Sequence, residues 1–223
     1  LPMTILPGGQ PKPLRILALS DQVMDHLYSH DVALRWPRID LLIGCGDLPF
    51  YYLDFLSSAL DAPLLYVRGN HDAGAYMTSD GRNQTGVESG RDIHGQVVWE
   101  QGLIIAGLEG SMRYRPKARC MYSEEEMFWE IAHLLPGLLW NRIKHGRALD
   151  ILITHSPPFG IHDLPDRAHT GFKIFLTLMK WARPRYLLHG HIHTRLNNDP
   201  QNSQYQNTTI MNVYPYRLLE YKP

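Results

Sequence analysis

The sequence contains few cysteines and no long hydrophobic run. Its two cysteines, Cys45 and Cys120, do not form a Cys-x-x-Cys pair, which excludes a disulfide framework, a zinc ribbon and a thioredoxin-like redox motif. No stretch of about eighteen apolar residues is present to span a bilayer, and the amino-terminal residues contain no apolar core of a signal peptide. We therefore expect a cytoplasmic protein that stays outside the membrane.

The chain also lacks an excess of charge of either sign. Lysine and arginine together number 22, as do aspartate and glutamate, so the formal net charge is zero and the protein has no general attraction for polyanions. The absence of a long basic track argues against a nucleic-acid partner. Histidine is abundant instead, with twelve residues that can bind metals or exchange protons near neutral pH.

Short apolar segments bounded by glycine, proline or polar residues predict strands. Because their apolar character is continuous, we expect them to be buried on both faces. These segments are residues 14–19, 41–44, 64–67, 151–154 and 186–188. Residues 97–108, which are split by Gln101-Gly102, predict a hairpin, and residues 208–213 and 216–221 predict another such pair, broken around Pro215.

Three stretches predict amphipathic helices, which begin after Pro49, at Ser123 and after Thr170. Ser123 and Glu126 form a capping-box pattern, and Pro136 predicts a kink or an end of the middle helix. The apolar faces are Tyr52, Phe55, Leu56 and Ala59, then Met127, Ile131, Leu134, Leu135 and Leu138, then Phe172, Phe175, Leu176 and Met179. This alternation of strands and helices predicts a layered α/β fold.

The predicted chain organisation is simple. Residues 1–13 are expected to form an extended amino-terminal segment, and residues 14–223 are expected to form one domain. Residues 73–95 contain little apolar character, which predicts a long loop of the kind that often has a function.

Metal-binding residue types follow five of the predicted strands at their carboxyl ends. Open α/β sheets place their ligand sites at this edge, and a mixture of aspartate, asparagine and histidine suits Mn²⁺, Fe²⁺ or Zn²⁺. In extended backbone, alternate residues point the same way, so the last three histidines are expected to share one side. The candidates are Asp21, Asp47, Asn70, His71, His155, His189, His191 and His193.

Four blocks of sequence resemble the signature of the calcineurin-like metallophosphoesterase superfamily. They are Gly46-Asp47, Gly69-Asn70-His71-Asp72, Thr154-His155 and Gly190-His191-Ile192-His193, in that order. The stretch around Thr154-His155-Ser156-Pro157-Pro158 is similar to a branch of small bacterial phosphoesterases related to the metallophosphoesterase-domain proteins. The resemblance implies a two-sheet β-sandwich flanked by helices, with a dinuclear metal centre at the strand ends.

The resemblance also implies a role for each matching residue. Asp47 is expected to bridge two divalent cations, which can be Mn, Fe or Zn, and His71 is the expected catalytic residue, acting on the leaving group as a general acid or a charge stabiliser. Two cations roughly 3.5–4 Å apart lower the pKa of a shared water and orient an in-line displacement at phosphorus. The implied ligands are Asn70, His155 and His191 at one site and Asp21 and His193 at the other.

One position departs from the family pattern. The family has Asp-x-His after the first strand, whereas this chain reads Asp21-Gln22-Val23, so valine stands where a histidine ligand is expected. We predict weaker binding at that site and a shifted metal preference, with water, Asp25 or His26 filling the vacant position.

Two further features have two interpretations each. His189 either orients a ligand through its second ring nitrogen or is a buried, hydrogen-bonded strand histidine. A basic cluster either holds a substrate phosphate or forms a solvated loop. Its members are Arg113, Arg115, Lys117 and Arg119, with Tyr114 among them.

The sequence therefore predicts a metal-dependent phosphoester hydrolase, acting as a phosphodiesterase or phosphomonoesterase on a small molecule. One alternative is a binding or scaffold protein on the same fold, which Val23 favours. The six other ligand positions argue against it, because a decayed site is expected to lose charged groups together. Another alternative is a metal-dependent hydrolase of a different ester. No sequence feature indicates an oligomeric state.

Overall fold

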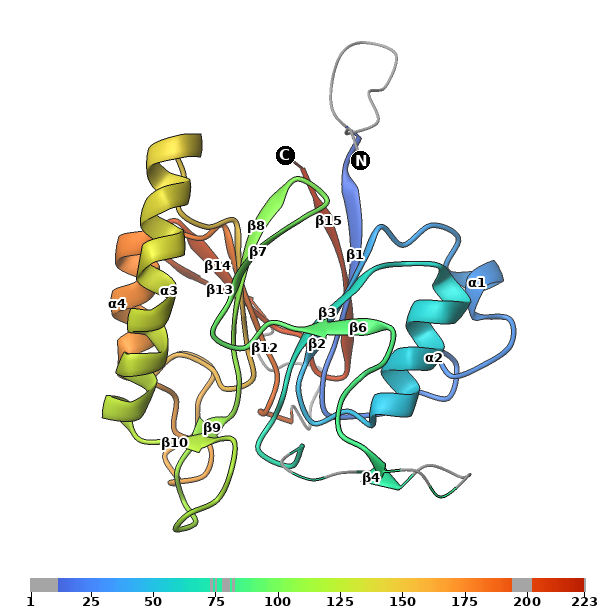
Figure 1. Ribbon diagram of the computed structural model, residues 1–223, viewed down its shortest axis with the longest axis horizontal. Helices are drawn as coiled ribbons and strands as arrows, with labels where there is room; N and C mark the ends of the chain where they lie inside the picture. Colours follow the sequence, from blue (N-terminus) through green and yellow to red (C-terminus); the bar gives the residue numbers. More distant parts are fainter. Residues whose placement is uncertain are drawn as a thin grey trace.

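Two β-sheets lie face to face at the centre of the molecule, and helices cover the outer face of each sheet (Figure 1). The computed structural model describes residues 12–72, 74, 76, 77, 81, 83–193 and 202–222. Strand β11 contacts both β2 and β3 of the facing sheet. The two-sheet sandwich flanked by helices that the resemblance implied is confirmed.

The first sheet has the strand order β15-β1-β2-β3-β6. Four of its strands run parallel, and β15 pairs with β1 in the antiparallel direction. The strands are β1 (Leu14–Leu19), β2 (Leu41–Cys45), β3 (Leu64–Val67), β6 (Gly90–Asp92) and β15 (Tyr216–Tyr221). The first three match the predicted buried strands.

The second sheet has the strand order β13-β14-β12-β11-β8-β7, with four parallel strands at its centre. Its strands are β7 (Val97–Glu100), β8 (Leu103–Leu108), β11 (Ile151–Thr154), β12 (Tyr186–His189), β13 (Asn202–Tyr205) and β14 (Thr208–Asn212). The hairpin of β7 and β8 is confirmed. Its turn residues, Gln101 and Gly102, both have positive φ, as a tight two-residue hairpin turn requires.

The second predicted hairpin is wrong. β14 and β15 do not pair with each other, because β14 lies beside β12 in the second sheet while β15 lies beside β1 in the first. The segment around Pro215 carries the chain from one sheet to the other. A sequence pattern of two adjacent apolar segments with a short connection is compatible with a hairpin and with two strands in different sheets.

The helices form the two outer layers. α1 (Val32–Arg35) and α2 (Phe50–Leu60) cover the first sheet, while α3 (Glu124–His145) and α4 (Lys173–Ala182) cover the second. The capping box of Ser123 and Glu126 is present at the start of α3. Pro136 neither ends nor divides α3, because Ile131, Leu134 and Leu138 on either side of it are buried and hold the helix against the sheet.

Three apolar clusters account for the layering. One lies between the two sheets, one between the second sheet and α3 and α4, and one between the first sheet and α1 and α2. Strands that are buried on both faces need continuous apolar sequence, which is what β1, β2, β3 and β11 contain. Within the described residues, no helix combines the length and the apolar character needed to cross a bilayer.

Four short strands lie outside the sandwich. β4 (Tyr76–Met77) pairs with β5 (Asn83–Gln84), and β9 (Ser111–Met112) pairs with β10 (Met121–Tyr122). The predicted loop of residues 73–95 therefore contains short strands, and part of it lies outside the described residues. Residues 1–11 of the predicted amino-terminal segment also lie outside the described residues.

Candidate metal centre

The parallel strands of both sheets end at a common edge, where three candidate ligands have unusual backbone conformations. Asp21, Asp47 and His191 have φ values of 64°, 54° and 67°. This left-handed region costs residues with a Cβ atom roughly 1–2 kcal/mol. Such strain persists where the surrounding structure imposes it, often at functional sites.

Glycines beside these residues allow the loops to converge. A Cβ atom on Gly46, whose φ is 91°, would lie 2.6 Å from Nδ1 of His155. A Cβ atom on Gly190 would lie 2.5 Å from Oδ2 of Asp21. Both distances are far below van der Waals contact, so only glycine permits the approach. The Gly-Asp and Gly-His pairs of the sequence thus have a steric cause.

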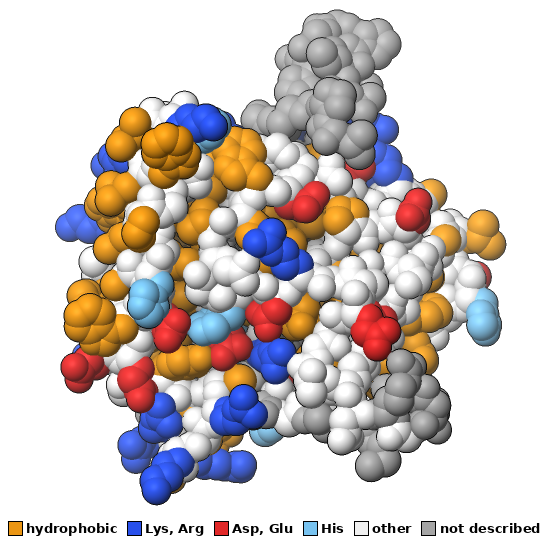
Figure 2. Space-filling view, viewed as in Figure 1, with side chains coloured by type: hydrophobic (Ala, Val, Ile, Leu, Met, Phe, Trp, Pro, Cys, Tyr) orange, Lys and Arg blue, Asp and Glu red, His pale blue; other side chains and the backbone are white. Residues whose placement is uncertain are grey.

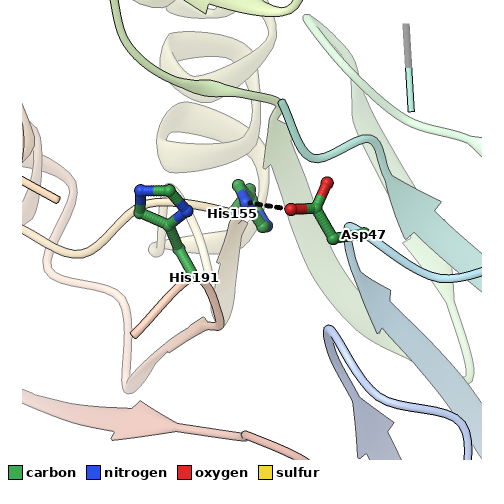
Figure 3. Close-up of side chains that lie close together, drawn as sticks. All are labelled: Asp47, His155 and His191. Atoms are coloured by element: carbon green, nitrogen blue, oxygen red, sulfur yellow. Dashed lines mark ion pairs between the residues drawn. The ribbon is translucent and has the colours of Figure 1, made fainter. Parts of the chain in front are cut away.

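His155 is the most constrained side chain of the site. It is completely buried, and its Nδ1 lies 2.8 Å from the carbonyl oxygen of Cys45. A carbonyl oxygen only accepts hydrogen bonds, so Nδ1 carries a proton. Nε2 therefore faces the opposite side, where it lies 3.1 Å from Oδ1 of Asn70. It also lies 3.4 Å from Oδ2 of Asp47 (Figure 3).

His191, which follows the end of β12, completes this group. Its Nε2 lies 2.8 Å from the carbonyl oxygen of Ala168, which leaves Nδ1 as the nitrogen free to bind a metal. One ligand atom each from Asp47, His155 and His191 can be chosen so that all three lie within 4.8 Å of one another. With Oδ1 of Asn70 beside them, these nitrogen and oxygen atoms fit a divalent transition metal.

The electrostatics of the group separate its two histidines. Burial lowers the pKa of His155, but the charge of Asp47 and the contact with it outweigh burial and raise that pKa to about 9. Burial and repulsion from His155 lower the pKa of His191 to about 4. Burial opposes ionisation of Asp47, yet His155 holds its pKa down to about 2. The metal-free site therefore holds one imidazolium, one neutral imidazole and one carboxylate at neutral pH.

Asp21 and His193 form a pair beside this group. Oδ1 of Asp21 lies 3.2 Å from Nε2 of His193, and Oδ2 accepts hydrogen bonds from the hydroxyl of Ser20 and, at 2.9 Å, from the backbone N–H of His191. The ring of His193 stacks on Tyr214. Among the described residues, only Asp47, His155 and His191 form a set of three closely clustered ligands, so Asp21 and His193 are less closely gathered.

The position that departs from the family pattern is used for packing. Val23 packs against the apolar cluster between the first sheet and its helices. His26 places its ring edge-on to Tyr216, with centroids 5.2 Å apart, and Asp25 is exposed to solvent. Neither residue belongs to the clustered ligand set of the described chain.

His71, the expected catalytic residue, lies at the rim of the centre. Its backbone N–H donates a hydrogen bond of 2.8 Å to Oδ1 of Asp47, and the residue is exposed to solvent. His71 thus contacts a candidate ligand through its backbone and is accessible to solvent.

His189 does not share a side with the histidines that follow it. β12 ends at His189, and the positive φ of His191 breaks the extended backbone on which that expectation rested. Nδ1 of His189 donates to the carbonyl of Gly190, and Nε2 accepts from Nδ1 of His162 at 2.9 Å. Nε2 of His162 accepts from the hydroxyl of Ser203 at 2.9 Å. Burial lowers the pKa of both histidines, so the chain of hydrogen bonds is neutral.

Two other contacts to the site come from residues outside the candidate ligand set. The buried carboxylate of Asp72 accepts hydrogen bonds from the backbone N–H groups of Asp47 and Gly69, at 2.7 and 2.9 Å. The hydroxyl of Tyr114 accepts a hydrogen bond from Nδ2 of Asn70 at 3.2 Å, which fixes the orientation of the Asn70 amide. Tyr114 lies in the basic cluster, but that cluster gave no signal for this contact.

Asp72 offers a test of how these loops are held together. Asp72→Ala leaves two amide donors without their acceptor, so we expect the free energy of unfolding to fall by about 2–4 kcal/mol. Mn²⁺ affinity should fall as well, because Asp47 loses its backbone anchor. Urea unfolding and Mn²⁺ titration measure both effects, with Asp72→Asn as the shape-matched control. Unchanged stability in Asp72→Ala would show that the two hydrogen bonds do not hold the loops.

Comparison with known proteins agrees with the fold. The family model for calcineurin-like phosphoesterases matches residues 15–195. An uncharacterised protein of Haemophilus influenzae is 27% identical over 87% of this chain and 84% of its own. One crystal structure matches 93% of this chain and 95% of its own with a TM-score of 0.62, and that of TT1561 of Thermus thermophilus matches 90% and 89% with a TM-score of 0.57, each at 15% identity. At this low identity, the two structural matches show a shared fold alone. The family model spans all four sequence blocks, and the chain belongs to the calcineurin-like phosphoesterase family.

Proposed function

We propose that this protein is a metal-dependent hydrolase of small phosphoesters. Family membership suggests this reaction class, and one observation carries the proposal for this chain. Nε2 of His155 faces Asn70 and Asp47 because Cys45 holds the other ring nitrogen. His191 offers a ligand atom in the same cluster. The four candidate ligands therefore meet at the ends of four separate loops.

The proposed division of roles follows the contacts. Asp47, Asn70, His155 and His191 would hold one divalent cation, Mn, Fe or Zn, and Asp21, Asp47 and His193 a second. Bound divalent cations supply Lewis-acid chemistry and lower the pKa of water.

The protein's own groups complete the proposed reaction. His71, an exposed residue whose backbone N–H contacts Asp47, would donate a proton from its imidazole to the departing oxygen of the substrate. Cys45 keeps the Nδ1 proton of His155 in place. Tyr114 keeps the Asn70 carbonyl turned toward His155.

We propose that the two sites bind metal unequally. Val23 offers no donor atom and packs on apolar residues, while His193 has a side chain that is 58% exposed. At the other site, Asn70, His155 and His191 are all buried. The second cation is therefore expected to bind more weakly than the first.

Val23→His tests this inequality. We expect the substitution to tighten the weaker Mn²⁺ equivalent by about tenfold or more, because a histidine restores a nitrogen donor at that position. Calorimetric titration measures both equivalents, with Val23→Leu as the apolar control and Asp25→Ala and His26→Ala as tests of replacement ligands. Two equally tight equivalents in the unaltered protein, insensitive to Asp25→Ala and His26→Ala, would refute a weak site.

The alternative is a binding or scaffold protein on this fold, and Val23 is the observation that favours it. Hydrolysis of bis(4-nitrophenyl) phosphate and 4-nitrophenyl phosphate separates the two proposals. We expect Mn²⁺-dependent turnover of at least one ester, abolished by chelator and restored by Mn²⁺. Mn²⁺ binding without turnover of either ester would favour the scaffold. Turnover of only the diester or the monoester would assign the substrate class.

A further inference from the structure

Helix α3 has a second apolar face that nothing in the described chain covers. Its inner residues, among them Met127, Leu134 and Leu138, are buried against the second sheet. Its outer surface nevertheless has large apolar side chains along most of its length, with the exposed His133 among them. The exposed large side chains there are Phe128, Trp129, Leu135, Leu139, Trp140 and Ile143. Leu135, which the sequence placed on the core face, belongs to this outer surface.

This outer apolar face of α3 is large for an unpartnered surface. Ile143 is 80% exposed and Trp140 is 62% exposed. At about 200 Å² per large side chain, the six residues expose roughly 600 Å². Typical largest patches on monomers reach about that size and are often functional, and one partner in a standard-size interface buries about 800 Å². Figure 2 shows hydrophobic side chains gathered along the edge where α3 lies.

The face is hollowed as well as apolar. A groove of about 410 Å³ runs between α3 and α4. Phe128, Leu135 and Leu139 line it from α3, and Ile174 and Trp181 line it from α4. Large side chains from an opposing helix can therefore insert between the two helices rather than lie on a flat surface.

The charges at the two ends of α3 indicate what covers this face. The first turn contains three glutamates, and the last turn contains Arg142, Lys144 and His145. Two copies of α3 packed antiparallel bring each acidic turn beside the basic turn of the other copy. An anionic membrane would attract the last turn but repel the first. The charge pattern is thus self-complementary.

We propose that the outer face of α3 is a two-fold interface between two copies of this chain, with the two α3 helices antiparallel. A two-fold interface uses the same patch on both subunits. If the helices cross near Leu135 and Pro136, Phe128 of each copy lies opposite Ile143 of the other, and Glu125 lies opposite the last turn. The 22 residues of α3 span about 33 Å, long enough for four turns of contact.

Sedimentation equilibrium of the full chain, from about 1 to about 100 µM, tests this proposal. We expect a dimer whose dissociation constant rises at least tenfold in Leu139→Glu, since a central residue is replaced by a charge. Leu139 is about half exposed, so the variant should keep the unfolding temperature of the unaltered protein. Leu34→Glu, at an 83% exposed residue of α1, is the matched control and should remain dimeric.

Charge reversal tests the antiparallel arrangement. Glu125→Lys and Lys144→Glu should each weaken the dimer, and the double variant should restore it, because both contacts are then reversed together. A monomer over the whole concentration range would overturn the proposal, as would a monomer that cosediments with phosphatidylglycerol vesicles. A dimer that is equally tight in Leu139→Glu would show that a different surface mediates association.

Discussion

Asp47→Asn is expected to lower Mn²⁺ affinity and phosphoester hydrolysis by at least about 100-fold. Residues that merely orient metal ligands account for 10–100-fold effects, and Asp47 is proposed to contact both cations directly. The substitution removes the charge while keeping the shape. The asparagine side chain would keep an oxygen that can accept the backbone N–H of His71, as Asp47 does.

The same substitution is expected to leave the fold intact. Asparagine tolerates the left-handed conformation that residue 47 adopts. His155 loses its counter-charge, but its pKa then falls and the buried imidazole becomes neutral rather than remaining an unpaired charge. The metal-free variant should therefore unfold cooperatively at a temperature close to that of the metal-free unaltered protein at pH values above about 9, where His155 is neutral in both proteins.

Asp61→Asn is the matched control for this experiment. Asp61 also has a left-handed backbone, with a φ of 48°, but it caps the carboxyl end of α2 and is exposed. Asp61→Asn should retain full activity and metal affinity. If Asp47→Asn hydrolysed phosphoesters at the rate of Asp61→Asn, Asp47 would not be part of the active centre.

The metal affinity of the site that contains His155 is expected to rise by about tenfold per pH unit between pH 7 and 9. The pKa of His155 is about 9 in the metal-free protein, so a cation must displace its proton at lower pH. Asp47 and His191 have pKa values of about 2 and about 4, so neither holds a proton in this range. Binding should therefore release close to one proton at pH 7.

Calorimetry in buffers of different ionisation enthalpy measures this proton release. His133→Gln, which replaces a histidine whose side chain is 72% exposed on α3, is the control and should behave as the unaltered protein. Release should decline toward zero as the pH rises beyond 9. Release of no proton at pH 7 would mean that His155 is already neutral in the metal-free protein. Asp47 would then not keep His155 protonated.

The raised pKa of His155 also affects the stability of the metal-free protein. Because the folded-state pKa of about 9 lies above the ordinary value of 6.5, this histidine stabilises the fold fully below pH 6.5. That contribution is lost as the pH rises through 9. The metal-free protein should therefore lose stability over the range in which the metal binds more tightly.

The fold was largely predictable because most of the central strands consist of continuous apolar sequence. β1, β2, β3 and β11 follow from that pattern alone, and the capping box of Ser123 places the start of α3. Local signals failed where distant contacts decide. Pro136 lowers helix propensity locally, yet the packing of α3 on the second sheet preserves the helix.

The candidate site was predictable to the extent that its residues lie at strand ends. Residue types and order indicate Asp47, Asn70, His155 and His191, and the fold brings them together. The contacts of Tyr114 and His162 were not predictable, because Tyr114 reaches Asn70 across 44 residues and His162 reaches His189 across 27. Only the folded arrangement of the loops creates these hydrogen bonds.

Calorimetric titration of Mn²⁺ into chelator-treated protein tests the central claim most directly. We predict one tight equivalent that disappears in His155→Ala and Asp47→Asn, followed by a weaker equivalent that is sensitive to Asp21→Asn. The tight equivalent should accompany the recovery of phosphoester hydrolysis in the same sample. Tight binding that survives both His155→Ala and Asp47→Asn would contradict the assignment of the metal centre.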